Sequence, residues 1–288
     1  MTKRAWKMLA ALLVFALCSF LYIRYTKGAV SGDIAYGDDP LQMLDVYAGS
    51  NCPADGCTVL VAVHGGGWSG GDKADFYHSG VAANLARHGM VVVVPNYRLS
   101  PKVVHPAHVQ DVAAAIAWSF ANVQRWGGNP QRTYLLGHSA GAHLVALVGT
   151  NPFYLQEHGL SLANIKGVVS LDTSSLDLER RVRVWGSDDD MRTTAFPAGS
   201  ERNASPVWNV RAGTQYPAFL LLAASNSSES IAHAGVMGAK LAEVSGKGEV
   251  AVMPYDGPDG SSHIRIFTDL DDDDKPVTQK ILSFINSY

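Results

Sequence analysis

The stretch Gly137-His138-Ser139-Ala140-Gly141 decides the fold prediction for this chain of 288 residues. It follows the apolar run Thr133 to Leu136 and precedes the helix-like run Ala142 to Val148. A G-x-S-x-G between a strand and a helix is typical of a tight turn that requires small flanking residues and raises the serine hydroxyl above the sheet. Ser139 is therefore the candidate nucleophile.

A second glycine motif lies upstream of that turn. Thr58 to Val63 is a continuous apolar run, as a buried parallel strand requires, and it ends in His64-Gly65-Gly66-Gly67-Trp68. Three glycines after a buried strand leave backbone N–H groups free to face a ligand. We expect the N–H groups of Gly66, Gly67 and Ala140 to form an oxyanion hole.

Composition indicates one globular α/β domain with a good-sized core, since 47% of the residues are hydrophobic and 17% are charged. The formal net charge is −3, and the charges are dispersed. Because no basic stripe is present to neutralise phosphates, we expect no nucleic-acid partner. We expect neither a metal nor an organic cofactor.

The N-terminal residues, 1–28, are expected to be a signal-anchor or a signal peptide. Basic residues precede the mostly apolar run Met8 to Ile23, and Arg24 and Lys27 follow it. Poor cleavage sites favour an uncleaved anchor that holds the protein at the membrane, with the body exported to the periplasmic or extracytoplasmic face. Secretion after cleavage is the alternative.

Cys52 and Cys57 lie in one short loop. They are either joined in a disulfide, as an oxidising compartment would allow, or remain two unpaired thiols.

Beyond residue 29 the pattern alternates between strands and helices. The predicted strands are Ile34 to Tyr36, Met43 to Tyr47, Thr58 to Val63, Met90 to Val94, Gly167 to Leu171, Ala218 to Ala224 and Val250 to Met253. The predicted helices are about Phe76 to His88, Ala107 to Val123 and Val277 to Ile285. Asp111, in the second of these helices, is expected to be a structural rather than a catalytic carboxylate.

These motifs, together with Tyr97-Arg98-Leu99-Ser100-Pro101 and Gly127-Gly128-Asn129-Pro130, make the chain resemble the α/β-hydrolase fold. Within that fold it resembles the acetylesterase-like and kynurenine-formamidase-like branch, the BD-FAE esterases. The resemblance covers about residues 34–288. It implies a central, mostly parallel sheet with helices on both faces, a catalytic domain over residues 29–288 and a small cap-like insertion at about 172–216.

The resemblance also implies a serine hydrolase with the order serine, acid, histidine along the chain. His263 follows the last predicted strand in a loop where the family carries its catalytic base. His138 occupies the variable position of the turn, His143 is expected to point away from the serine, and His64 belongs to the glycine loop.

The triad acid is where the sequence departs from the family pattern. No aspartate follows the strand Ala218 to Ala224, and Glu229 is the only carboxylate in the residues after it, 225–230. We therefore prefer Glu229, because a glutamate can orient the imidazole as an aspartate does. Asp172, at the end of the preceding strand, is the rival, and Asp177 is a weaker third choice.

The predicted cap-like segment contains a run of arginines, Arg180, Arg181 and Arg183, near Asp188-Asp189-Asp190. Solvent-exposed ion pairs are the favoured interpretation of these charges, over recognition of an acidic substrate.

The predicted activity is hydrolysis of small or short-chain carboxylic esters through an acyl-enzyme. An arylformamidase-type amidase is the first alternative, and a non-catalytic binding or scaffold protein on a decayed hydrolase fold is the second. The partners expected are a small-molecule ester and, through an uncleaved N-terminal segment, a membrane. Acyl-chain length and oligomeric state stay open.

Overall fold

The computed structural model describes residues 30–185, 194–246, 248–255 and 261–288. The signal-anchor predicted for residues 1–28 lies outside them, as do Asp188, Asp189 and Asp190. Within these four ranges, no helix is both long enough and apolar enough to cross a membrane.

One eight-stranded sheet organises the described chain, in the order β1-β2-β4-β3-β5-β6-β7-β8. Its strands are β1 Val30–Ala35, β2 Met43–Tyr47, β3 Cys57–Val63, β4 Met90–Pro95, β5 Gly128–His138, β6 Ile165–Leu171, β7 Ala218–Ala224 and β8 Gly248–Met253. β2 pairs antiparallel with both β1 and β4, and all other neighbours are parallel.

The two faces of the sheet bury separate cores because side chains alternate along each strand. In β3, Val59, Val61 and Val63 belong to one core, and Leu60 and Ala62 belong to the other. A strand buried on both faces reads as a continuous apolar run, which is why it could be predicted from the sequence.

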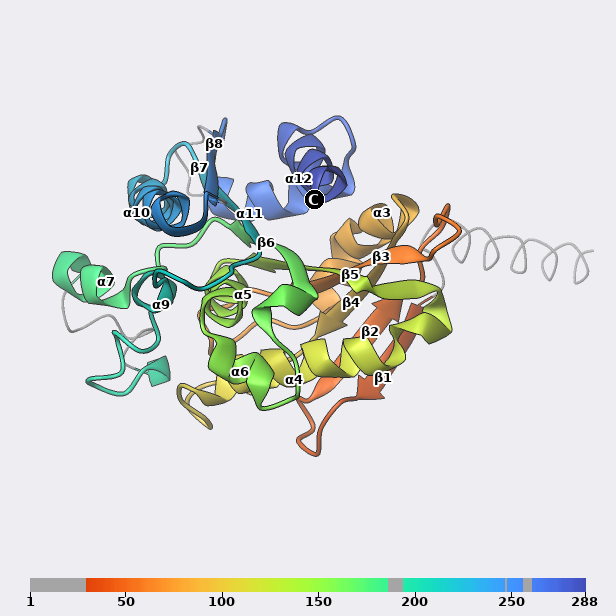
Figure 1. The fold of residues 1–288 in the computed structure, drawn as a ribbon, viewed down its shortest axis with the longest axis horizontal. Coiled ribbons are helices and arrows are strands. Elements are labelled where there is room, and N and C mark those ends of the chain that lie inside the picture. Colours follow the sequence, from red (N-terminus) through yellow and green to blue (C-terminus); the bar gives the residue numbers. More distant parts are fainter. Residues whose placement is uncertain (1–29, 186–193, 247, 256–260) are drawn as a thin grey trace, which may run out of the picture.

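Helices cover both faces, as Figure 1 shows for α4 and α5 on one side and α3 and α12 on the other. The first core includes residues of α4 (Ala107–Asn122), α5 (Ala140–Thr150) and α10 (Ser228–Ser245). The second includes residues of α3 (Val81–Arg87), α11 (Ser262–Thr268) and α12 (Pro276–Ser287). The predicted α/β-hydrolase architecture is confirmed.

The remaining α-helices described are short: α2 (Ala74–His78), α6 (Pro152–Gln156), α7 (Leu178–Trp185) and α9 (Pro206–Asn209). The single helix predicted from Phe76 to His88 is wrong, because the structure has α2 and α3 there. Gly80, at a φ of 79°, separates them in a left-handed conformation that a continuous helix does not allow.

The turn between β5 and α5 depends on its glycines. Ser139 has a φ of 55° and a ψ of −117°, outside the usual helical and strand regions. A Cβ on Gly137 would clash with the carbonyl oxygen of Gly141, and a Cβ on Gly141 would clash with that of Val63. The backbone segments therefore approach closely enough to expel Ser139 from the sheet plane.

Candidate active site

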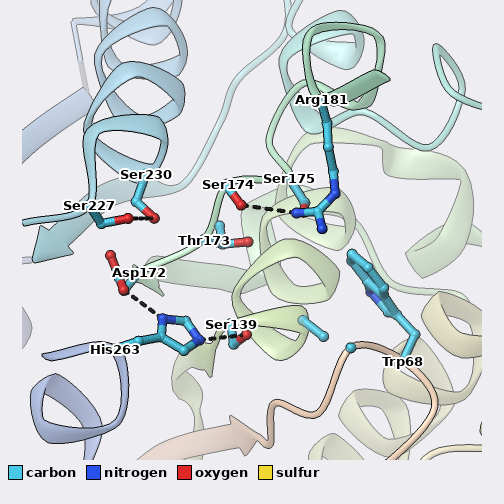
Figure 2. A pocket seen from close by; sticks show the side chains of 12 residues that line it. Trp68, Ser139, Asp172, Thr173, Ser174, Ser175, Arg181, Ser227, Ser230 and His263 are labelled. Carbon is cyan, nitrogen blue, oxygen red and sulfur yellow. Dashed lines mark hydrogen bonds and ion pairs between the residues drawn. The ribbon is translucent and has the colours of Figure 1, made fainter. Parts of the chain in front are cut away.

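Three side chains from different elements form a hydrogen-bonded chain at the carboxyl edge of the sheet (Figure 2). Ser139 lies between β5 and α5, Asp172 follows β6, and His263 is in the first turn of α11. Nε2 of His263 lies 2.9 Å from Oγ of Ser139, and Nδ1 lies 2.6 Å from Oδ2 of Asp172. This is the geometry of a nucleophile, a base and an orienting acid.

The main chain fixes the carboxylate of Asp172 in place. The residue is fully buried with a φ of 50°, and its N–H donates to the carbonyl of Leu222. Oδ1 accepts from the N–H of Ala224 at 3.0 Å, so Oδ2 is left for His263. A carboxylate held in this way selects the imidazole tautomer that carries its proton on Nδ1.

The preferred assignment of Glu229 as the acid is wrong, because His263 pairs with Asp172. Glu229 lies in the first turn of α10, where its two oxygens accept from Nε and Nη2 of Arg180 at 3.2 and 3.3 Å. Glu229 and Arg180 therefore form a structural ion pair that joins α10 to α7.

Asp177, the third choice for the acid, also accepts hydrogen bonds from residues other than His263. Its Oδ1 accepts from the N–H of Arg180 at 3.0 Å and from the indole N–H of Trp208 at 3.3 Å. The sequence signal that distinguishes Asp172 is its place directly after the last residue of a buried strand.

His138 lies against His263. Its Nε2–H donates to the carbonyl oxygen of His263 at 2.7 Å, and its ring lies between those of His263 and Phe267, with centroids 4.6 and 5.2 Å away. Burial, followed by the neighbouring His263, lowers the pKa of His138 to about 3. The neutral imidazole thus supports the main chain at His263, a role that its place in the motif did not indicate.

The two other histidines near the turn are structural. His143 accepts from the indole N–H of Trp68 at 3.2 Å and donates to the carbonyl of Ala204 at 2.7 Å. His64 donates to the carbonyl of Gly65 at 2.7 Å and stacks on Tyr97. Burial lowers the pKa of both histidines, to about 3 for His143.

The glycine loop lies beside Ser139. Gly66, Gly67 and Trp68 have φ values of 108°, 58° and 60°, and the carbonyl of Gly66 accepts from the N–H of Gly70 at 2.9 Å. Ala140 is the first residue of α5, so its N–H has no intrahelical acceptor. Gly66, Gly67 and Ala140 line the cavities that contain Ser139, and their role in stabilising an oxyanion stays a prediction.

Two cavities meet at the triad. One, of about 480 Å³, has a lining that includes Thr173, Ser174, Ser175, Arg181, Ser227 and Ser230. The other, of about 570 Å³, is lined by the glycine loop, α2 and α11. Gly67, Ser139 and His263 border both, so a bound ester can extend in two directions from the serine.

Between β6 and β7 the chain carries α7 and α9, in the range predicted for a cap-like insertion. Two neighbouring arginines of α7 differ in their surroundings. Arg180 pairs with Glu229, whereas Arg181 lines the smaller cavity. Among the described residues, no group of three or more His, Cys, Asp and Glu side chains could hold a metal ion.

Comparison with known proteins finds sequence similarity to esterases over part of the chain. Residues 44–170 match the model of the BD-FAE family. Esterase LipC of Mycobacterium tuberculosis is 41% identical over 116 residues, which are 40% of this chain and 28% of that protein. The isoprenylcysteine alpha-carbonyl methylesterase ICME of Arabidopsis thaliana is 36% identical over 138 residues, 48% of this chain and 31% of that protein. The chain thus spans less than a third of the length of these curated relatives.

Solved structures extend the comparison over nearly the whole chain. Esterase B from Lactobacillus Rhamnosis superimposes with a TM-score of 0.71 at 21% identity, covering 99% of this chain and 96% of that one. A crystal structure described as a putative thioesterase from silicibacter sp. gives the same TM-score at 21% identity, covering 92% and 88%. The chain therefore has the α/β-hydrolase fold, and its residues 44–170 carry the sequence pattern of the BD-FAE family, the esterase branch that its glycine motifs resemble.

Proposed function

We propose that this protein is a serine carboxylic ester hydrolase that acts through an acyl-enzyme on small or short-chain esters. The observation that carries the proposal is the hydrogen-bonded series Ser139, His263 and Asp172 at the junction of two cavities. The esterase names of the relatives support it.

In the first step, Oγ of Ser139 attacks the ester carbonyl while Nε2 of His263 takes its proton. Asp172 stabilises the imidazolium through Nδ1–H, and the N–H groups of Gly66, Gly67 and Ala140 receive the oxyanion. His263 then protonates the departing alcohol. Water, activated by the same histidine, hydrolyses the acyl-enzyme and restores Ser139.

The geometry of the site bears differently on the two alternative functions, a non-catalytic scaffold and an amidase. A non-catalytic scaffold was suggested by the missing aspartate after β7, and Asp172 removes that support because it supplies a carboxylate from the neighbouring strand. An arylformamidase-type amidase would use the same three side chains, so the substrate profile distinguishes it from an esterase.

We further propose that the domain is exported and that residues 1–28 anchor it to the membrane when they are not cleaved. A disulfide joins Cys52 and Cys57, which supports an oxidising compartment. Fractionation of cells that make the full chain, followed by protease treatment of spheroplasts, tests the proposal. Protein found only in the cytosolic fraction would contradict it.

The activity is tested on the full chain with p-nitrophenyl acetate, p-nitrophenyl butyrate and N-formylkynurenine, alongside labelling by a fluorophosphonate. We expect turnover of the esters and labelling, and expect both to vanish in Ser139→Ala. Folded wild-type protein that neither turns over esters nor labels would overturn the proposal. Faster turnover of the formamide than of both esters would favour the amidase.

A further inference from the structure

The smaller cavity has a wall rich in hydroxyl groups. Besides Ser139, the described residues that line it include five that carry a hydroxyl: Thr173, Ser174, Ser175, Ser227 and Ser230. Three of them follow Asp172 directly, and the other two lie at the start of α10. Such a wall offers hydrogen-bond donors to an oxygen-rich group.

Arg181 adds a positive charge to this wall. It is 7% exposed, and its Nη1 donates to Oγ of Ser174 at 2.9 Å and to Oγ of Ser175 at 3.2 Å. Figure 2 shows the side chain extending from α7 toward the space between Ser174 and Trp68. The guanidinium and two hydroxyls thus form one cluster within the cavity that contains the nucleophile.

The helix that carries Arg181 is held at its start. Oδ1 of Asp177 accepts from the N–H of Arg180 at 3.0 Å, and the N–H of Leu178 donates to Oγ of Ser205 at 2.7 Å. A charged group that is positioned before a ligand arrives loses little conformational entropy on binding.

We propose that this cavity binds a free carboxylate of the substrate, so that the preferred esters are those that bear a second, ionised carboxyl group, such as monoesters of short dicarboxylic acids. The inference rests on the proposed ester hydrolysis. Arg181 and the hydroxyls of Ser174 and Ser175 bind the carboxylate, and Ser139 attacks the ester carbonyl. With a monoester of a dicarboxylic acid, water adds across the ester bond to give a dicarboxylate, an alcohol and one released proton, and the bound carboxylate takes no part in the bond changes.

The two cavities differ in the charged and apolar side chains that line them. In the smaller one, the carboxylate of Asp172 is fully buried and its oxygens are occupied by His263 and Ala224. In the larger one, the lining includes Asp75 together with the apolar side chains of Ile264 and Phe267. The carboxylate of Asp75 repels an anionic group from the larger cavity, which leaves that cavity for the uncharged part of the ester.

The test compares pairs of esters that differ only in a carboxylate replacing a methyl group. Monomethyl succinate is paired with methyl butyrate, and monomethyl glutarate with methyl pentanoate. O-acetylglycolate is paired with ethyl acetate, which places the carboxylate in the alcohol part. Turnover by the full chain is followed in a pH-stat at pH 7. We expect wild type to have the higher kcat/KM on the charged member of at least one pair.

Arg181→Gln is expected to lower the charged-to-neutral ratio of kcat/KM about 10- to 100-fold, the scale of one or two hydrogen bonds to a charged group. Arg181→Lys should retain part of the ratio, because it keeps the positive charge. It should not retain all of it, because lysine lacks the planar guanidinium that binds a carboxylate through two hydrogen bonds. Arg180→Gln is the matched control: it removes the neighbouring arginine, which does not line the cavity, and should leave the ratio unchanged.

The inference is overturned if wild type prefers the neutral member of every pair, or if Arg181→Gln lowers both members by the same factor. The second result would mean that Arg181 only holds the loop of Ser174 and Ser175. If Arg181→Gln does not fold, the wild-type ratio and competitive inhibition by free succinate, compared with butyramide, decide the matter. Loss of all ester turnover and labelling would instead overturn the proposed function itself.

Discussion

The carboxylate of Asp172 lies 2.6 Å from Nδ1 of His263, although 91 positions separate the two residues in the chain. The other oxygen of Asp172 accepts from the N–H of Ala224, the last residue of β7. The sheet itself therefore orients the carboxylate. His263 is left with Nε2 as the acceptor for the hydroxyl of Ser139.

Replacing Asp172 with Asn should lower kcat on p-nitrophenyl acetate about 10⁴-fold, because the amide presents a donor to Nδ1 and stabilises the wrong imidazole tautomer. Glu229→Gln is the matched control, and it should change kcat less than about threefold because Glu229 pairs with Arg180. Thermal unfolding of each variant checks that the fold persists. A larger loss of kcat in the Glu229 variant would reverse the assignment of the acid.

Gly66→Ala should lower kcat at least about 10²-fold, the usual effect of losing one oxyanion donor. The new Cβ would clash with the carbonyl of Gly70, and the φ of 108° is strained for any other residue. Gly70→Ala serves as the control, since its Cβ would have one neighbour, the oxygen of Gly66, at an ordinary 3.6 Å. The two variants are compared by steady-state kinetics. Equal losses would show that the conformation of Gly66 is not required.

His138→Phe keeps an aromatic ring against Phe267 but removes the donor to the carbonyl of His263. We expect kcat to fall about 3- to 10-fold with KM little changed, which is the scale of one neutral hydrogen bond. His138→Gln, which restores a donor, should recover part of the loss. A change in KM alone would contradict this positioning role.

His143 makes stability depend on pH. Its pKa is about 3 in the folded protein against an ordinary value of 6.5, because burial disfavours the charged ring. The contribution is fully present above pH 6.5 and is lost as the pH falls toward 3, since only the unfolded chain takes up the proton in that range.

Urea unfolding at pH 7 and pH 5 measures this dependence. Wild type should lose about 2 kcal/mol more between these two pH values than His143→Gln does. The comparison isolates His143 because the other buried histidines are the same in both proteins. Equal losses of unfolding free energy in the two proteins would show that His143 does not cause the pH dependence.

Asp111 joins α4 to the segment after β4. Its carboxylate accepts from Nε and Nη2 of Arg98 and from Nε2 of Gln42, and its side chain is 2% exposed. Asp111→Asn should lower the free energy of unfolding by about 3 kcal/mol, because it leaves the guanidinium without its counter-charge.

The control for that prediction is Asp55→Asn. Asp55 pairs with Arg132 on the surface at 3.5 Å, and removing an exposed pair should cost at most about 1 kcal/mol. Both values come from urea unfolding at pH 7. Equal costs would show that burial of the Asp111 pair does not matter.

Local rules in the sequence were enough for much of the fold. β2 and β7 have the predicted ends, because runs of buried apolar residues bounded by turn residues leave little choice of strand. The helix break at Gly80 was missed, because a glycine interrupts a helical pattern less strongly than a proline would. The helix α10 was missed as well.

The sequence by itself determined the turn that carries Ser139, the glycine loop and the position of His263 after the last strands. The turn and the loop depend on short-range backbone geometry that only glycines permit. The position of the histidine follows from chain order. The choice of acid was decided only by the tertiary structure. β6 and β7 are parallel neighbours with Leu171 opposite Leu222, so Asp172 emerges at the edge where His263 arrives. Glu229 is carried on α10 toward Arg180 instead, and no sequence spacing reports which of two carboxylates meets a residue that distant along the chain.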